Sequence, residues 1–192
     1  MGVALVPLTN ILDSYSSNRK QSETLWMSTV DLIEASLTND EGGKHTLYNK
    51  FFQLMNGFAA FWRVDKLRKL ISTLITQVKV CPSLGLNETR ATLKNCLGAI
   101  VAIVDDDTSL KNLNLELLMQ TRSDDAQVRL YALQCAEHLW SEHSDKLSGI
   151  VSDVVTFIAE SADDEHDQVA KAARGLKKII EKRCGGLDVL MQ

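Results

Sequence analysis

Two related stretches decide the fold of this chain. DDAQVRLYALQCAEHL at residues 124–139 is followed 41 residues later by EHDQVAKAARGLKKII at residues 165–180. Both open with acidic residues, continue with a valine and place an alanine four residues after that valine. The same offset aligns apolar positions in these stretches and in the helix expected before each of them, as follows: Val128 with Val169, Ala132 with Ala173, Leu139 with Ile180, Leu113 with Val154, and Leu117 with Ile158.

A repeat of about 40 residues built from a pair of helices fits HEAT or armadillo repeats and excludes the shorter classes of 33–34 residues. Each hairpin leaves an apolar face that only the next hairpin can cover, so the hairpins stack. A closed bundle of unrelated hairpins is the alternative. We predict an all-α, HEAT-like α-solenoid of stacked antiparallel helical hairpins.

Apolar residues recur with helical spacing along nearly the whole chain. Two prolines and ten glycines in 192 residues also argue against an all-β fold. The prediction divides one continuous solenoid into divergent HEAT-like hairpins at 1–104 and C-terminal HEAT repeats at 105–192. Four helices are expected to begin near Ser22, Thr46, Asp65 and Asn87. Four more are expected at 109–121, 125–142, 146–161 and 165–183, with turns at 123–124, 144–145 and 163–164.

Composition limits the class of function. The formal charge of −4 argues against a protein that coats nucleic acid, so any contact with RNA must be a local patch. The four cysteines are scattered without a CxxC pair, which is typical of a reduced intracellular protein. No apolar run approaches the roughly 20 residues of a membrane span, so we expect a soluble protein.

The sequence predicts no catalytic residues, no cofactor and no bound metal, because no catalytic motif is present. His138 and His143 are five residues apart, about 140° around a helix, and should not share a metal ion. Cys135 and His138 share a helix face, but two ligands without a second pair make a weak site. We expect the acidic runs at 105–107 and 163–165 to lie at helix boundaries, where acids meet the next N-terminus favourably.

Two surfaces are candidates for contact with a partner. Lys171, Arg174 and Lys178 recur at i, i+3 and i+7, and this one-sided stripe could meet RNA phosphates or an acidic partner. A solvated face near a helix C-terminus is the structural alternative. Trp62 and Arg63 could anchor a protein partner, since Trp and Arg lead interface hot spots, although a Trp is also typical of a core.

The segment that includes Asp125, Val128, Arg129 and Ala132 resembles the opening of the second helix of a HEAT repeat. In that resemblance the acid caps the helix, Val enters the core and Ala allows close packing. Arg129 is then expected to bond a neighbouring turn.

A more specific resemblance begins upstream, where SLKNLNLELLMQTR at residues 109–122 leads directly into residues 125–133. Together with VTFIAE at 155–160 and the acids at 163–165, it resembles the C-terminal end of the large HEAT-repeat, U3 small nucleolar RNA-associated family of the small-subunit processome (Utp ten, or HEAT-repeat-containing protein one). The match covers roughly residues 105–192. The family's aromatic residue and Pro are replaced around Lys111 and Asn112, and its Gly-Glu-Pro end is replaced at Gly185-Gly186-Leu187.

The resemblance implies a non-catalytic scaffold in the nucleus and nucleolus that acts in 18S rRNA maturation, ribosome biogenesis and rDNA transcription. Its implied partners are processome proteins and the U3 ribonucleoprotein, with limited contact to pre-rRNA, no membrane and no small-molecule substrate. The chain matches only the final tenth of such proteins, as a fragment or as the product of a short gene. A HEAT adaptor in transport or in the cytoskeleton is the alternative.

Overall fold

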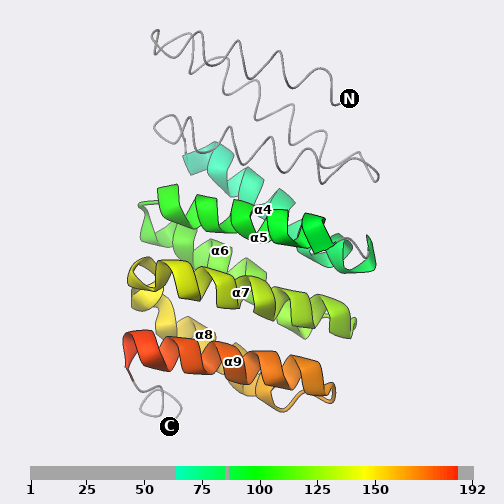
Figure 1. The fold of residues 1–192 in the computed structure, drawn as a ribbon. Coiled ribbons are helices and arrows are strands. Elements are labelled where there is room, and N and C mark those ends of the chain that lie inside the picture. The colour runs from blue at the N-terminus through cyan, green and yellow to red at the C-terminus, as the bar shows by residue number, and fades with distance from the viewer. Residues whose placement is uncertain (1–63, 85–86, 186–192) are drawn as a thin grey trace, which may run out of the picture. The chain divides into compact units, whose positions relative to one another are not determined.

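The computed structural model describes residues 64–84 and 87–185 (Figure 1). The chain forms two compact units, Met1–Thr73 and Leu74–Gln192. Only residues 64–73 of the first unit are described, and they are helical. The helices predicted near Ser22 and Thr46 lie outside the described residues.

Every element of the described part is helical, and no strand occurs there. The all-α stack of helical hairpins that the sequence predicts is confirmed, while the division at residues 104 and 105 stays a prediction. In chain order the elements are α4 (Val64–Val80), the 3-10 turn η2 (Cys81–Leu84), α5 (Asn87–Ile103), α6 (Asp107–Met119), η3 (Gln120–Arg122), α7 (Ala126–Leu147), η4 (Ser148–Ile150), α8 (Val151–Ala162) and α9 (Asp167–Cys184).

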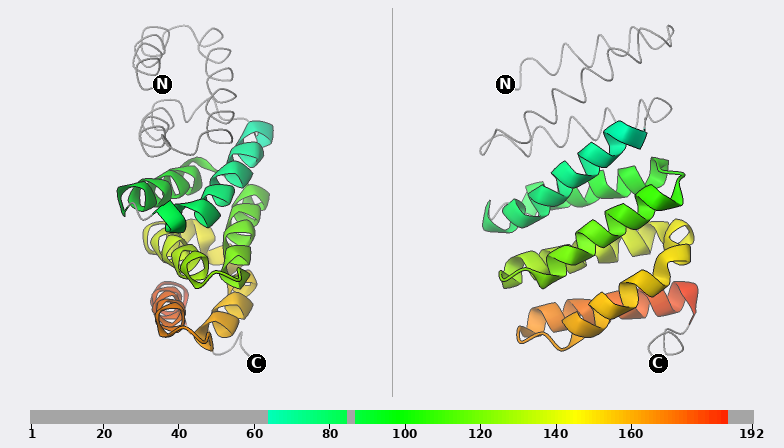
Figure 2. Two further views of the ribbon diagram at one scale, coloured as in Figure 1. Left: turned by 90° about the vertical axis from the view of Figure 1, so that its right-hand side faces the viewer. Right: turned by 180° about the vertical axis from the view of Figure 1, so that it is seen from behind.

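The helices of the second unit form two layers. α5, α7 and α9 lie side by side in one layer, and α6 and α8 lie beside each other in the other (Figure 2). α7 contacts α5 on one side and α9 on the other, and it also packs on α6 of its own hairpin. Each hairpin therefore covers the apolar face of its neighbour, as stacked repeats require.

The 41-residue repeat is confirmed by burial. The ten residues that the offset pairs are between 0% and 4% exposed in the two hairpins α6–α7 and α8–α9. Ala132 and Ala173, both fully buried, occupy the same place in α7 and α9. Small side chains at these positions let α7 and α9 pack closely against the other helices.

Polar contacts fix where helices begin and how hairpins are tied together. The carboxylate of Asp106 caps α6 by accepting from the Ser109 backbone N–H at 2.8 Å. Lys146 on α7 donates to the carbonyl oxygens of Ala102 and Val104, at 2.7 and 2.9 Å, at the end of α5. These carbonyls have no partner further along their own helix, so the ammonium group both satisfies them and joins the two hairpins.

The sequence predicted a helix that ends at residue 142 and a turn at 144–145. The helical backbone does break there, at His143 (φ −130°, ψ 28°), one residue before the predicted turn, and it is helical again up to Leu147. Ser144 is buried, whereas a polar turn would be exposed. α8 begins at Val151, five residues later than the start predicted at 146, because the 3-10 turn η4 precedes it.

Candidate functional site: the Arg129 network and the basic face of α9

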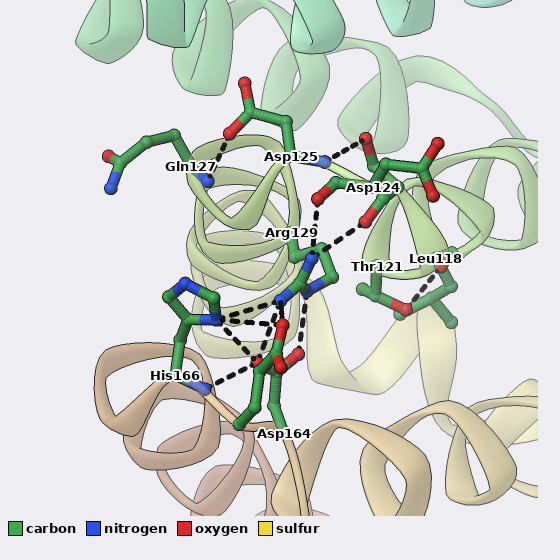
Figure 3. A network of polar contacts seen from close by, with 10 residues as sticks. Leu118, Thr121, Asp124, Asp125, Gln127, Arg129, Asp164 and His166 are labelled. Atoms are coloured by element: carbon green, nitrogen blue, oxygen red, sulfur yellow. Dashed lines mark hydrogen bonds and ion pairs between the residues drawn. The ribbon is translucent and has the colours of Figure 1, made fainter.

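Arg129 lies at the centre of a polar network between two successive hairpins (Figure 3). Its guanidinium donates two hydrogen bonds to the Asp164 carboxylate, at 2.7 and 3.0 Å, in the bidentate geometry of strong ion pairs. It also donates to the carbonyl oxygens of Ser123 and Asp124, at 3.0 and 3.1 Å. Arg129 thus joins the turn before α7 to the turn before α9.

Both members of this ion pair are well buried. Their side chains are 11% and 10% exposed, for Arg129 and Asp164 respectively. The hydrogen bonds from Arg129 lower the pKa of the Asp164 carboxyl, and the same contact raises the pKa of the guanidinium. Asp164 also accepts from the backbone N–H of His166, at 2.9 Å, so its carboxylate orders the start of α9 as well.

The other three residues of the predicted HEAT signature take the expected places. Asp125 caps α7 by accepting from the Gln127 backbone N–H at 2.8 Å. Val128 and Ala132 face the core and are 4% and 0% exposed. The sequence predicted that Arg129 would bond a neighbouring turn, but it placed Asp164 only at a helix boundary and did not identify it as the partner.

The stripe of Lys171, Arg174 and Lys178 lies on the exposed side of α9. Arg174 donates to the carbonyl oxygen of Ala162 at 3.3 Å, at the end of α8. Lys182, one turn further on, is exposed on the same helix. Trp62 and Arg63 lie outside the described residues, so their role in binding a protein partner stays a prediction.

A second surface, on α6 and α8, is one that the sequence did not single out. Leu115 and Met119 are the large apolar residues that the structure leaves exposed in its described part, at 41% and 47%. Arg122 lies 4.5 Å above the ring of Phe157 and pairs with Glu160 at 2.8 Å. Spacing along α6 alone could have placed Leu115 beside Met119, but not the neighbours from α8.

His138 and His143 both approach α5 at Gly98, although they are five residues apart in α7. The Nε2 atoms of both rings lie close to the point where a Cβ atom on Gly98 would stand, at 3.3 and 3.5 Å. The backbone break at His143 redirects its ring, so the 140° expected for a continuous helix does not apply. Burial lowers the pKa of each imidazole, and nearby Lys94 and Lys146 lower them further, while Glu142 opposes this.

Within residues 64–84 and 87–185, no group of three or more His, Cys, Asp and Glu side chains is arranged to hold a metal ion. Cys135, paired with His138 in the sequence analysis, is fully buried, and burial raises the pKa of its thiol to about 12. A thiol with such a pKa is protonated at neutral pH and is a poor nucleophile or ligand. No helix in the described part is both long and apolar enough to cross a membrane.

Comparison with known proteins agrees with the hairpin architecture. The family model described as "Stalled ribosome sensor GCN1-like, HEAT repeats" matches residues 64–183, which confirms the HEAT-like α-solenoid. No solved structure gave a significant match.

Curated relatives match the chain at low identity. The U3 small nucleolar RNA-associated protein 10 of Schizosaccharomyces pombe is 26% identical over 159 residues, which cover 82% of this chain and 9% of the relative. The HEAT repeat-containing protein 1 homolog of Drosophila melanogaster is 28% identical over 145 residues, which cover 76% of this chain and 6% of the relative. The chain therefore spans less than a tenth of the length of these relatives, and the resemblance predicted from residues 105–192 is confirmed.

Proposed function

Because this chain belongs to the family of HEAT repeats described as stalled ribosome sensor GCN1-like, we propose that it is a non-catalytic scaffold. Stacked hairpins bury their apolar residues against one another and leave long polar surfaces for binding. Such surfaces hold partners together without a catalytic pocket. The Arg129 network supports this role, since it fixes one hairpin relative to the next through two buried, charged side chains.

The assembly that we propose is the small-subunit processome, with its U3 ribonucleoprotein, in the nucleolus. The observation that carries this proposal is the similarity to the Schizosaccharomyces pombe protein whose name contains U3 small nucleolar RNA. The scaffold would then act in the maturation of 18S rRNA, in ribosome biogenesis and in rDNA transcription. Trp62 and Arg63 remain candidates for contact with a processome protein.

Affinity purification tests this function. The tagged chain is expressed in cells and recovered, and U3 RNA is quantified beside an abundant RNA of a different nuclear particle. Processome proteins are measured by mass spectrometry in the same samples, with and without ribonuclease. We expect U3 RNA and processome proteins to be enriched over an equally abundant tagged HEAT protein of unrelated sequence.

The matched control is the chain with Ala132→Leu, which overpacks the buried contact of α7 and should weaken any association that depends on the fold. Absence of both U3 RNA and processome proteins from the wild-type sample would refute the proposal. Recovery of transport or cytoskeletal proteins instead would favour an adaptor in one of those pathways.

A further inference from the structure

Three residues of α7 mark the face that receives the next hairpin. Leu130 lines a hollow of about 310 Å³ together with the first residues of α9. Glu137 places a carboxylate oxygen 3.8 Å from the point where a Cβ atom on Gly175 would stand. The carbonyl oxygen of Ser141 accepts a hydrogen bond of 3.5 Å from Arg183.

The 41-residue offset transfers this face from α7 to α9. It maps Leu130 to Lys171, Glu137 to Lys178 and Ser141 to Lys182. It also maps Leu133, which is fully buried, to Arg174, which is exposed. The face of α9 that corresponds to an interface between repeats therefore carries four cations. We call this set the α9 basic stripe; its members are Lys171, Arg174, Lys178 and Lys182.

The stripe is free of ion pairs within the described part of the chain. Several cations elsewhere in the unit are paired, among them Lys111 with Asp153 at 3.0 Å and Arg122 with Glu160 at 2.8 Å. Arg174 uses one N–H on a backbone carbonyl, which leaves its charge uncompensated. Since the whole chain has a formal charge of −4, the stripe is a local positive region on an acidic protein.

The chemistry of this face does not suit another hairpin. The offset maps the network residue Arg129 to Ala170, so α9 offers no guanidinium at this position to hold a following turn. Lysine is depleted in the cores of protein interfaces, and three of the four stripe residues are lysines. Phosphate groups, by contrast, are bound by arrays of Lys and Arg that release counterions.

We propose that the α9 basic stripe binds the phosphate backbone of RNA. This inference rests on the proposed function, because it assumes that the chain works in a particle that contains RNA. Lys171 and Lys182 lie about 16 Å apart along the helix axis, at a rise of 1.5 Å per residue, which is enough for a few successive phosphates. α9 has no aromatic residue on which a base could stack, so binding is independent of RNA sequence.

Fluorescence anisotropy of the full chain with a labelled RNA hairpin tests the stripe. Between about 50 and 200 mM salt, log affinity should fall against log salt with a slope of about −2 to −4, as expected for two to four neutralised phosphates. Lys171→Glu with Lys178→Glu should weaken binding at least tenfold at low salt. The same pair should reduce the slope by about 2, one unit for each phosphate that is no longer neutralised.

The matched control is Lys79→Glu, compared with Lys171→Glu alone, because each changes the net charge equally at one exposed position and Lys79 lies away from α9. Circular dichroism of both variants checks that they fold. The inference would be overturned if both variants lost RNA binding equally, or if the Lys→Glu substitutions in the stripe left RNA binding unchanged. So would a stripe variant that binds RNA normally but no longer captures an acidic protein after ribonuclease treatment.

Purification of the stripe variant from cells separates the two proposals. If wild-type chain recovers U3 RNA but the isolated chain binds no RNA hairpin, the processome proposal survives and the stripe inference fails. If the isolated chain binds RNA through the stripe and U3 RNA is never recovered, the choice of assembly fails instead.

Discussion

Replacing Arg129 with methionine should destabilise the second unit by about 3 kcal/mol. The substitution keeps most of the aliphatic volume of the side chain and removes only the guanidinium. Asp164 is then left as a carboxylate with 10% of its side chain exposed and without its cation. Breaking a buried ion pair by removing one partner costs about 3–5 kcal/mol, because the remaining charge is uncompensated.

The lower end of that range applies here for a structural reason. Asp164 keeps the hydrogen bond from the His166 backbone N–H after Arg129 is removed, so its carboxylate is not left entirely unsatisfied. The carbonyl oxygens of Ser123 and Asp124 lie at a partly exposed turn and can accept from water instead. Asp164→Asn should cost less, about 1–2 kcal/mol, because the amide oxygen still accepts one hydrogen bond from the guanidinium. The Arg129 charge also keeps a second carboxylate nearby, that of Glu165 at 3.8 Å.

Urea denaturation of four proteins tests this reasoning: the wild type, the two single variants and the double variant. The double variant removes both charges, so its loss of stability should be smaller than the sum of the single losses by about 1–2 kcal/mol. Additive losses, or a loss below about 1 kcal/mol for Arg129→Met, would show that the buried pair does not hold the hairpins together.

Acid titration provides an independent check on the same pair. The folded-state pKa of Asp164 lies below its ordinary value of 3.8, so its contribution is present above that value and is lost as the pH falls through the folded pKa. The stability of the wild type should therefore fall more steeply below about pH 4 than that of Arg129→Met.

Three further predictions concern the packing of α5, α7 and α9. Ala132→Leu should cost roughly 1–3 kcal/mol, because the position is fully buried, and an unchanged urea midpoint would contradict the close packing of α7. Gly175→Ala should stabilise the protein by up to about 1 kcal/mol, because alanine has the higher helix propensity. Gly98→Ala should not be stabilising, because its Cβ atom would lie 3.3 and 3.5 Å from the Nε2 atoms of two imidazoles. Equal urea midpoints for the two variants would be evidence against that contact. Stability should fall as the pH drops below about 6.5, because the pKa values of His138 and His143 are lowered on folding and the unfolded chain takes up protons first; replacing both by Gln should flatten this dependence in urea titrations between about pH 7 and 5.

The architecture was predictable because the repeat consists of apolar residues that recur at a fixed offset. The pairs at an offset of 41 residues needed only helical periodicity to be assigned to the core, and burial of Val128 and Val169 confirms that assignment. The capping role of Asp125 was predictable for a similar reason, since an N-cap acts within three residues of its own position.

Local rules failed where a helix departs from ideal geometry. Ser144 and Asp145 look like a turn in sequence, yet the backbone breaks one residue earlier, at His143, and the helix resumes. The angle of 140° between His138 and His143 assumed a continuous helix, and the break at His143 brings both rings close to Gly98 instead. Nothing in the identity of a single histidine marks such a break.

The ion-pair partner of Arg129 could not be predicted from the sequence, for a different reason. Arg129 and Asp164 are 35 residues apart, and several acids in the turn at 163–165 could have been the partner. The choice depends on how far one hairpin is shifted along the next, which the packing of α7 on α9 sets. A repeat offset alone relates equivalent positions in two hairpins, and Arg129 and Asp164 are not equivalent.

The α9 basic stripe can be interpreted with the repeat offset only once the packing of α7 on α9 is known. From sequence alone, Lys171, Arg174 and Lys178 fit a solvated helix face as well as a binding surface. The structure identifies Leu130, Glu137 and Ser141 as α7 residues that meet the following hairpin. At an offset of 41 residues, these three positions are all lysines on α9. The equivalent residues one repeat earlier are apolar, acidic or neutral. Exposure of a helix face does not by itself require this change to positive charge.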